Sequence, residues 1–466
     1  MNYNVNNNKN QLENETNNNF CETNNNFLFI PCSLKGFNNT NTILKTDSLG
    51  KQIYYFYGNI TLSDEEIICD CCGCKMHIND KREVDLKHIP LGEAYSYICI
   101  DRVQLFCKHC KFTKYQEIPF KEENHFITNQ AKNYTIDLLA TNKFTLKDVA
   151  YLTGLNKNLV KEIDKERLIK QYTVNGEGKK LIKPEEQANY LAIDEFKLHD
   201  GYKYASHIIN LENGHILWIA EGKKKKVVYD FINHVGLSWM NHVKAIACDM
   251  NSDFEEAFKD MCPHIKVVYD YFHIVKNLNE KVISEIRKDE QRRLENAGDK
   301  EAARRLKRTR FILTSNRETL ERKDDEANKK KVVSKGNELF KKDDVIRKGG
   351  NVDRYNQLIN ENELFLIIEL IKELLQLAYK SSNEKEMAEY IFEIMNLCET
   401  NGNKHLLWFR NLLYNHFDGI ITHATYKIST GPIEGINNKI KTIRRQSYGL
   451  PDDEYFFLKL LDMSRH

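Results

Sequence analysis

The stretch YLAIDEFKLHDGYKYASHIIN, residues 190–210, decides the fold, because it joins two apolar, strand-like runs and ends the first of them in acids. Those acids are Asp194 and Glu195. A carboxylate at the tip of a buried strand is costly unless water or a cation solvates it. The pattern fits a metal ligand, a capped turn or a solvated strand end, and for a single acid the solvated end is the first interpretation.

Further strand-like runs follow, and two of them also end in an acid. The runs are ILWIAEG, VKAIACDMN and IKVVYDYFHIVKN, and their acids are Asp249 and Asp270. LENGHI predicts a hairpin with a tight mirror-type turn at Asn213-Gly214, and NSDFEEAFKDMCP predicts a helix between two parallel strands. Asp194 and Asp249 lie 55 residues apart (249 − 194), which leaves room for three antiparallel strands and one crossover. That order brings both strand tips side by side, where functional groups of α/β sheets collect.

A third acid lies near the C-terminus, in STGPIEGINNKIKTIRRQSYGL. Pro432 is expected to open a helix there. Helical spacing puts several polar side chains on one face of that helix: Glu434, Asn437 or Asn438, Lys441 and Arg445. A solvated helix face is the plain alternative, whereas one acid among amides and cations suits a metal and a phosphodiester. Three carboxylates, Asp194, Asp249 and Glu434, without a histidine cage favour Mg²⁺ or Mn²⁺, and such ions promote phosphoryl transfer.

Cysteines are concentrated in one short segment, where seven of the twelve lie between residues 69 and 110. CDCCG and CKHC form two knuckles with metal-ligand spacing: Cys69, Cys72, Cys107 and Cys110. A two-residue gap lets both thiolates of a turn face one Zn²⁺, and Gly73 permits the positive φ of such a turn. Four ligands make the zinc structural, with YSYICIDRVQLF between them as ribbon strands. Cys74 or His109 could replace a neighbouring ligand, and buried free cysteines are the alternative to a metal.

The segment KFTLKDVAYLTGLNKNLVKEIDKERLIK, residues 143–170, has a helix–turn–helix pattern. Thr145 is expected to cap the first helix and Gly154 to make the turn. The second helix then presents polar side chains suited to phosphates and base edges in a major groove: Asn156, Lys157, Asn158 and Lys161. A generic helical hairpin explains the pattern equally well, but the neighbouring zinc ribbon favours DNA.

Composition limits the remaining possibilities. The chain has 466 residues, too many for one core, and its 69 basic and 67 acidic residues give a net charge of only +2, so a basic surface must be local. No run of 18 apolar residues predicts a membrane span, and an Asn-rich start without an apolar centre predicts a disordered lead-in rather than a secretory signal. The expected location is therefore the cytoplasm. Residues 276–425 have the periodicity of amphipathic helices.

Taken in order, these motifs resemble the DDE transposases of bacterial insertion sequences, in particular the ISL-three family. The resemblance covers the CxxCG…CxxC finger, the helix–turn–helix, AIDEF, ACDMN, VVYDYFHIVKN and GPIEGINNKIKTIRRQSYGL. It implies an RNase H-like core in which Asp194, Asp249 and Glu434 bind the catalytic Mg²⁺. The extra cysteines and the long Asn-rich start depart from the family pattern and leave the zinc ligands open.

The resemblance also implies roles for residues around the triad. Asp270 and His273 would lie near the scissile phosphate, and Lys441 beside the cleaved bond. Arg444 and Arg445 are further candidate DNA contacts. The implied activity is binding to terminal inverted repeats, strand cleavage and transfer of the new 3′-hydroxyl to target DNA, by at least a dimer on DNA associated with the bacterial nucleoid.

The expected architecture is a multidomain α/β chain. Its zinc-ribbon and helix–turn–helix modules precede an RNase H-like core that an α-helical insertion interrupts. The expected segments are a disordered lead-in (1–40), a zinc-finger domain (41–125), a helix–turn–helix domain (126–180), the first part of the core (186–275), the insertion (276–425) and the last part of the core (426–466). Two rival functions are a transposase-derived DNA-binding regulator without cleavage, which has no use for the three acids, and a nuclease of the same fold.

Overall fold

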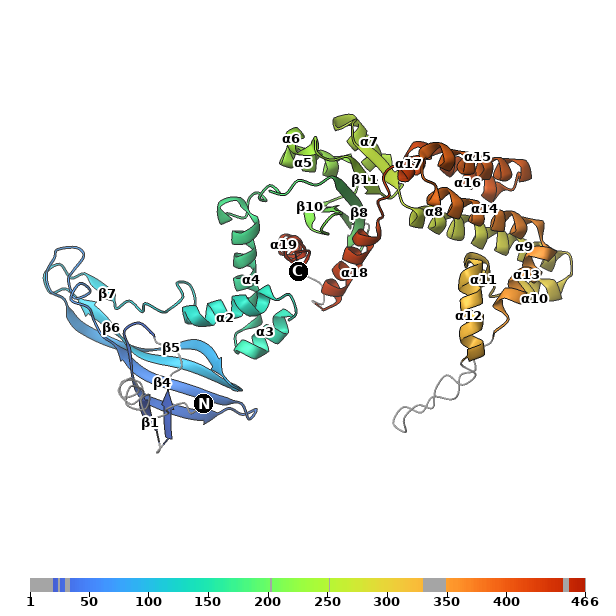
Figure 1. Ribbon diagram of the computed structural model, residues 1–466. Coiled ribbons are helices and arrows are strands. Elements are labelled where there is room, and N and C mark those ends of the chain that lie inside the picture. The colour runs from blue at the N-terminus through green and yellow to red at the C-terminus, as the bar shows by residue number, and fades with distance from the viewer. Residues whose placement is uncertain are drawn as a thin grey trace, which may run out of the picture. The chain divides into compact units, whose positions relative to one another are not determined.

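The chain forms two compact units, which are described here one at a time (Figure 1). The computed structural model describes residues 20–23, 26–29, 34–201, 203–250, 252–329, 349–446 and 452–465. Unit 1 contains residues up to 182 together with 442–464, and unit 2 contains residues 183–441 together with Arg465. Most of the Asn-rich lead-in expected over 1–40 lies outside the described residues. Its described part contains two short paired strands, β1 (Phe20–Thr23) and β2 (Asn26–Phe29).

Unit 1 is built on a five-stranded sheet with the order β3-β4-β6-β5, in which β7 also pairs with β6. The strands are β3 (Phe37–Thr46), β4 (Gln52–Ile60), β5 (His77–Leu91), β6 (Ala94–Phe106) and β7 (Thr113–Tyr115). Phe56 of β4 and Ile98 of β6 are paired neighbours and are fully buried in the core of unit 1. Residues alternate between the two faces along each strand, so such positions recur with a period of two. The run expected to form ribbon strands is therefore the long central strand of a larger sheet.

Three helices follow the sheet, one more than the sequence predicts: α2 (Asn129–Ala140), α3 (Leu146–Thr153) and α4 (Lys157–Tyr172). Thr145 caps α3 as predicted, and Asp148 completes a reciprocal capping box. Gly154 makes the predicted turn with φ of +69°. A Cβ atom there would lie 2.8 Å from Lys87 Nζ and 2.9 Å from the Tyr95 ring, so the turn requires glycine for its φ and for its close approach to the sheet.

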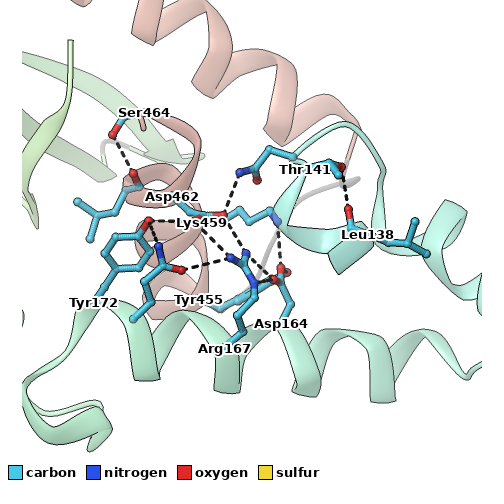
Figure 2. A network of polar contacts seen from close by, with 12 residues as sticks. Leu138, Thr141, Asp164, Arg167, Tyr172, Tyr455, Lys459, Asp462 and Ser464 are labelled. Carbon is cyan, nitrogen blue, oxygen red and sulfur yellow. Dashed lines mark hydrogen bonds and ion pairs between the residues drawn. The ribbon is translucent and has the colours of Figure 1, made fainter. Parts of the chain in front are cut away.

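The C-terminal helix α19 (Asp453–Met463) packs against α4 within unit 1 (Figure 2). Asp462 is fully buried and accepts hydrogen bonds from Arg167 Nη2 at 2.8 Å, Tyr172 Oη at 2.9 Å and Asn142 Nδ2 at 2.9 Å. Arg167 also binds Asp164, which is equally buried. Every charge in this network has partners from another helix, which is the condition under which charges can be buried. The sequence places 426–466 with the core, whereas α19 belongs to unit 1.

Asp164 closes the network from the α4 side. Its Oδ2 accepts hydrogen bonds from Tyr455 Oη at 2.7 Å and Lys459 Nζ at 3.0 Å, both on α19. Near the start of α19, Asp452 Oδ2 lies 3.2 Å from Lys161 Nζ and 3.0 Å from Lys165 Nζ. The pairing therefore extends along one whole side of α4.

Unit 2 contains a second five-stranded sheet with the order β10-β9-β8-β11-β12. The strands are β8 (Tyr190–His199), β9 (Lys203–Asn210), β10 (Ile216–Glu221), β11 (Ala245–Cys248) and β12 (Lys266–Tyr269). β8, β9 and β10 are antiparallel, whereas β11 runs parallel to β8 and β12, as the sequence predicts. Helices α5 (Lys225–Val235), α6 (Leu237–Met240) and α7 (Ser252–Met261) contribute side chains to the core on one face of this sheet (Figure 1).

The β9–β10 hairpin forms where LENGHI predicts it, but its turn differs from the prediction. The connection spans residues 211–215, and of Asn213 and Gly214 only Gly214 has a positive φ, at +77°. The prediction of a two-residue turn of the mirror type is therefore wrong. Asn210 closes the hairpin, because its N–H donates to His215 O and its carbonyl oxygen accepts from Gly214 N, whereas Leu211 N donates to Tyr190 O on β8.

Between β12 and the last long helix, the described residues are almost wholly helical, as predicted. The elements are α8 (Tyr271–Asn277), a π-helical turn η3 (Leu278–Ile283), α9 (Ser284–Asn296), α10 (Lys300–Leu306), α11 (Arg310–Thr314), α12 (Arg317–Lys329), α13 (Asn351–Glu361), α14 (Glu363–Lys380), α15 (Glu384–Asn401), α16 (Lys404–Asn415), α17 (Phe417–Ile421) and α18 (Gly431–Gln446). One apolar core continues from the sheet into these helices. Among the described residues, no helix combines the length and the apolar character needed to span a bilayer.

The α4–α19 network generates a stability prediction for Asp462→Ala. Because the variant leaves Arg167 buried without one of its carboxylates, the free energy of opening α4 and α19 should fall by about 3–5 kcal/mol. Hydrogen exchange of peptides from both helices in the full chain measures this change.

Glu454→Gln is the matched control. The Glu454 side chain is 85% exposed and 3.8 Å from Lys165, so its loss should cost about 0–1 kcal/mol. Equal exchange rates in the Asp462→Ala variant and the wild type would contradict the prediction.

Candidate functional site

Two acids of unit 2 lie next to each other where the parallel pairing of β8 with β11 ends. Cys248 is the last residue of β11 and pairs in parallel with Ile193 of β8, so the next residues along the two strands are Asp249 and Asp194. Both side chains are partly buried. Asp249 follows the end of β11, whereas β8 continues to His199 and Asp194 pairs with His207 of β9. The predicted strand end at Asp194 is therefore wrong, but the register of the parallel pair still makes the two acids neighbours. The predicted juxtaposition of Asp194 and Asp249 is therefore present.

His273 holds the second acid. It lies in the first turns of α8, is buried, and its Nδ1 is 3.1 Å from Asp249 Oδ1. Burial alone would raise the pKa of Asp249, but the His273 contact outweighs burial and the pKa is lowered. Burial would likewise lower the pKa of His273, but Asp249 outweighs it and that pKa is raised. The pair favours a charged carboxylate at Asp249, which is the form that binds a cation.

Asp270 holds the start of α18. Its Oδ2 accepts hydrogen bonds from Thr430 Oγ1 at 2.6 Å, Thr430 N at 2.8 Å and Ser429 Oγ at 3.2 Å. Asp270 is itself buried at the residue just before α8. These bonds tie the end of β12 to the residues directly before Gly431, where α18 begins. Asp270 is therefore a positioning group for the helix that carries Glu434.

Asn437 brings α18 to the first acid. Its Nδ2 donates to Asp194 Oδ2 at 2.6 Å, and Glu434 lies three residues earlier on the same face of the helix. Glu434 and Lys441 are exposed. Among the described residues, the only sets of three metal-ligating side chains with ligand atoms within 4.8 Å of one another are cysteine-based. The three carboxylates are therefore not that close together, because Asn437 rather than Glu434 contacts Asp194.

The chemistry of the donors fits a divalent cation. Burial raises the pKa of Asp194 and the nearby Asp249 adds to that rise, so the site carries negative charge that a cation would stabilise. Asn437 Oδ1 and Glu195 Oε2 are buried and have no hydrogen-bond partner among the described residues. Unpaired buried oxygens are costly, and oxygen ligands are those that Mg²⁺ prefers.

Three contributing residues are absent from the sequence-based site. Ser429 and Thr430 bind Asp270, and the only sequence signal for them is their place before a Gly-Pro helix start. His207 is fully buried and pairs across strands with Asp194. Burial lowers the pKa of His207 to about 3, so an uncharged ring lies beside the acid. Strand alternation alone cannot distinguish such a residue from an ordinary core position.

The four knuckle cysteines also come together. Cys69 Sγ is 3.4 Å from Cys110 Sγ, and Cys72 Sγ is 3.5 Å from Cys107 Sγ. All four sulfurs lie within 4.8 Å of one another, and tetrahedral zinc with bonds of ~2.3 Å requires sulfurs about 3.8 Å apart. The set fits zinc. Cys72, Cys74 and His109 form a second, overlapping set.

Each knuckle has the backbone turn that this ligation requires. Gly73 N donates to Cys69 O and Gly73 has φ of +70°, while Lys111 N donates to Cys107 O and Lys111 has φ of +64°. Backbone N–H groups, Cys110 N first, lower the pKa of the Cys107 thiol to about 6. The knuckle glycine is at its predicted conformation, and a lysine takes the equivalent place in the second turn.

The structure divides the candidate DNA contacts of α4 into two groups. Lys157 and Asn158 are exposed in the first turn. Asn156 is the N-cap, and its side chain accepts from Asn158 N at 2.8 Å. Lys161 is paired with Asp452 instead. At the end of α18, the Arg444 guanidinium lies 5.9 Å from the Phe456 ring centre, and Arg445 is exposed.

The Asp270 contacts generate a prediction for Asp270→Ala. The variant removes the charged acceptor of three hydrogen bonds, from Thr430 N, Thr430 Oγ1 and Ser429 Oγ. Opening of the first turn of α18 should therefore become at least about tenfold more frequent. Faster hydrogen exchange of the amides of residues 430, 431, 433 and 434 measures this. Ser429→Ala removes the longest of the three bonds and also the bond from Gly431 N to Ser429 Oγ, so it should speed exchange of Gly431 but leave that of residues 433 and 434 nearly unchanged. Equal exchange in both variants would contradict the anchoring role.

Comparison with known proteins identifies the family. A family model described as a transposase of the DDE type, ISL3 group, matches residues 191–460, which is more than half of the chain and includes the segments carrying all three acids. The transposase for insertion sequence element IS1001 of Bordetella parapertussis is 25% identical over 398 residues, which cover 84% of this chain and 88% of that protein. The chain therefore belongs to the ISL3 family of DDE transposases.

Proposed function

We propose that the chain cuts DNA at the ends of its own insertion sequence and joins the new 3′-hydroxyl to target DNA. One observation carries the proposal: Asp194 within β8 and Asp249 just after β11 directly follow the last residue pair of these two parallel strands. The strand order β10-β9-β8-β11-β12 supports an RNase H-like core. The unit 2 helices between β12 and α18 are then the insertion that separates the second and third acids.

In this proposal Asp194, Asp249 and Glu434 hold Mg²⁺ or Mn²⁺. The bound cation supplies charge neutralisation at the scissile phosphate and activation of the attacking oxygen. Asn437 orients Asp194 through its 2.6 Å hydrogen bond, and His273 keeps Asp249 charged through its 3.1 Å contact. Asp270 fixes the start of α18, the helix that would bring Glu434 to the two other acids.

DNA recognition is assigned to unit 1. Lys157 and Asn158 are exposed at the start of α4, where a recognition helix places residues that read base edges. Asn156 contributes by capping this turn, and Lys161 contributes less because Asp452 neutralises it. The proposed partners are the terminal inverted repeats and target DNA, and the proposed assembly is at least a dimer on DNA. Lys441, Arg444 and Arg445 are proposed phosphate contacts of α18.

Zinc is proposed at Cys69, Cys72, Cys107 and Cys110. The four sulfurs leave no open coordination position, so the ion would be structural. It would fix the two knuckles at the end of the β5–β6 hairpin, where the side-chain core is small.

The catalytic proposal predicts the behaviour of Asp194→Ala on a supercoiled plasmid carrying the element's own ends. The wild type should nick the plasmid at those ends with Mg²⁺. The nicking rate of the variant should be at least about a hundredfold lower, because the substitution removes one carboxylate ligand of the metal. Asp249→Ala and Glu434→Gln should behave in the same way.

Asp200→Asn is the matched control, because Asp200 is a fully exposed acid at the end of the same strand region and should cut like the wild type. Retention of end binding by Asp194→Ala, measured by gel shift, shows that the loss lies in chemistry. Wild-type chain that binds ends but does not cut with any divalent metal would establish the regulator instead. Cutting without joining would establish the nuclease.

The zinc proposal predicts one bound zinc ion per chain, measured by elemental analysis of the purified protein. Serine at Cys69, Cys72, Cys107 or Cys110 should abolish binding, because thiolates are the ligands. Cys71→Ser is the control, since Cys71 is exposed and belongs to neither cysteine set. Loss of zinc in Cys74→Ser with retention in Cys69→Ser would assign the ion to the overlapping set.

A further inference from the structure

Helix α14 (Glu363–Lys380) in unit 2 is apolar on two opposite sides. One side faces the core through five buried residues, Phe365, Ile368, Ile371, Leu375 and Ala378. The other side exposes three leucines: Leu366 at 46%, Leu370 at 40% and Leu377 at 46%. Single exposed leucines are ordinary. Three on one line of one helix need an explanation.

The exposed line has the spacing of a coiled-coil seam. The exposed residues of α14 in order are Glu363, Leu366, Leu370, Glu373, Leu377 and Lys380, separated by three, four, three, four and three positions. These are the a and d positions of successive heptads. Ile367 and Leu374, which are partly buried, lie beside the line and widen its apolar surface. We call this line of six exposed residues the α14 seam.

The α14 seam is complementary to itself when a second copy runs antiparallel. Antiparallel seams pair an a position with a d position, which places Glu363 opposite Lys380 and Leu366 opposite Leu377. The same two-fold arrangement places Leu370 opposite the aliphatic stem of Glu373. A parallel arrangement would instead put Glu363, Glu373 and Lys380 each opposite its own copy, and like charges in register are destabilising. Charge therefore selects one orientation.

We propose that the α14 seam is the contact through which two copies of this chain associate, antiparallel and about a two-fold axis near the middle of α14. A two-fold contact uses the same patch on both partners, and the seam satisfies this requirement at every layer. The inference rests on α14 alone and not on the proposed cleavage chemistry.

A single pair of helices of this length makes a small interface, so association of the free chain should be weak. Two chains held on one DNA molecule would experience a high effective concentration of each other. The two seams would then associate even though the affinity of the isolated contact is low. This limits the test to measurements that resolve weak self-association.

The first test is Leu370→Glu in the full chain, with sedimentation velocity over a range of concentrations. The wild type should shift from monomer to dimer as concentration rises. The variant should dissociate at least about tenfold more readily, because it puts two carboxylates in each central layer. Leu237→Glu is the matched control, because Leu237 is 56% exposed on α6 and should associate like the wild type. Unchanged circular dichroism confirms that both variants fold.

The second test determines orientation by charge reversal. Glu363→Lys and Lys380→Glu should each weaken the dimer, because each places like charges opposite one another at both ends. The double variant restores an opposite-charge pair in the antiparallel arrangement and should recover wild-type association. A wild type that stays monomeric at every concentration overturns the proposal, as does a dimer that Leu370→Glu leaves intact. Failure of the double variant to recover overturns the antiparallel pairing.

Discussion

The parallel pairing of β8 with β11 is the constraint on which the candidate active site depends. Its last pair is Ile193 and Cys248, so that Asp194, within β8, and Asp249, just after β11, are neighbours. Two carboxylates so placed repel each other in a partly dry environment, and the pKa of Asp194 rises for that reason as well as through burial. Every other element of the site stabilises or orients this pair. The proposed cation would neutralise the charge of this pair.

Helix α18 is held against these acids at two points. Asp270 binds the residues that precede its first turn, and Asn437 binds Asp194 from its second. The first contact connects α18 to the end of β12, and the second connects it to β8. The helix is therefore held in place relative to both strands. The position of Glu434 follows from those two contacts. Under the proposed function, a change that loosens either of them would lower the cleavage rate without removing a metal ligand.

Local sequence signals predict the local structure well. The Thr145 cap, the Gly154 turn and the knuckle glycine Gly73 are confirmed, since the cap needs a side-chain oxygen and both glycines take a positive φ that few other residues adopt. The antiparallel and parallel strand pairs are confirmed as well. Long-range contacts could not be predicted in the same way. Nothing in the letters of α19 indicates that it packs on α4, because paired buried charges such as Asp164 and Asp462 look like surface residues in a sequence.

The same limit applies to α14, where an apolar pattern indicates burial but does not say against what. A helix that is apolar on nearly all sides is expected in the centre of a core. Leu366, Leu370 and Leu377 are exposed instead, and only the structure separates them from the buried set on the opposite side. Their spacing, with acids and a lysine at symmetric places, then distinguishes a surface made for a second copy from a defect of packing. The α14 seam is thus an interaction site that composition and periodicity conceal, because both count its leucines as core.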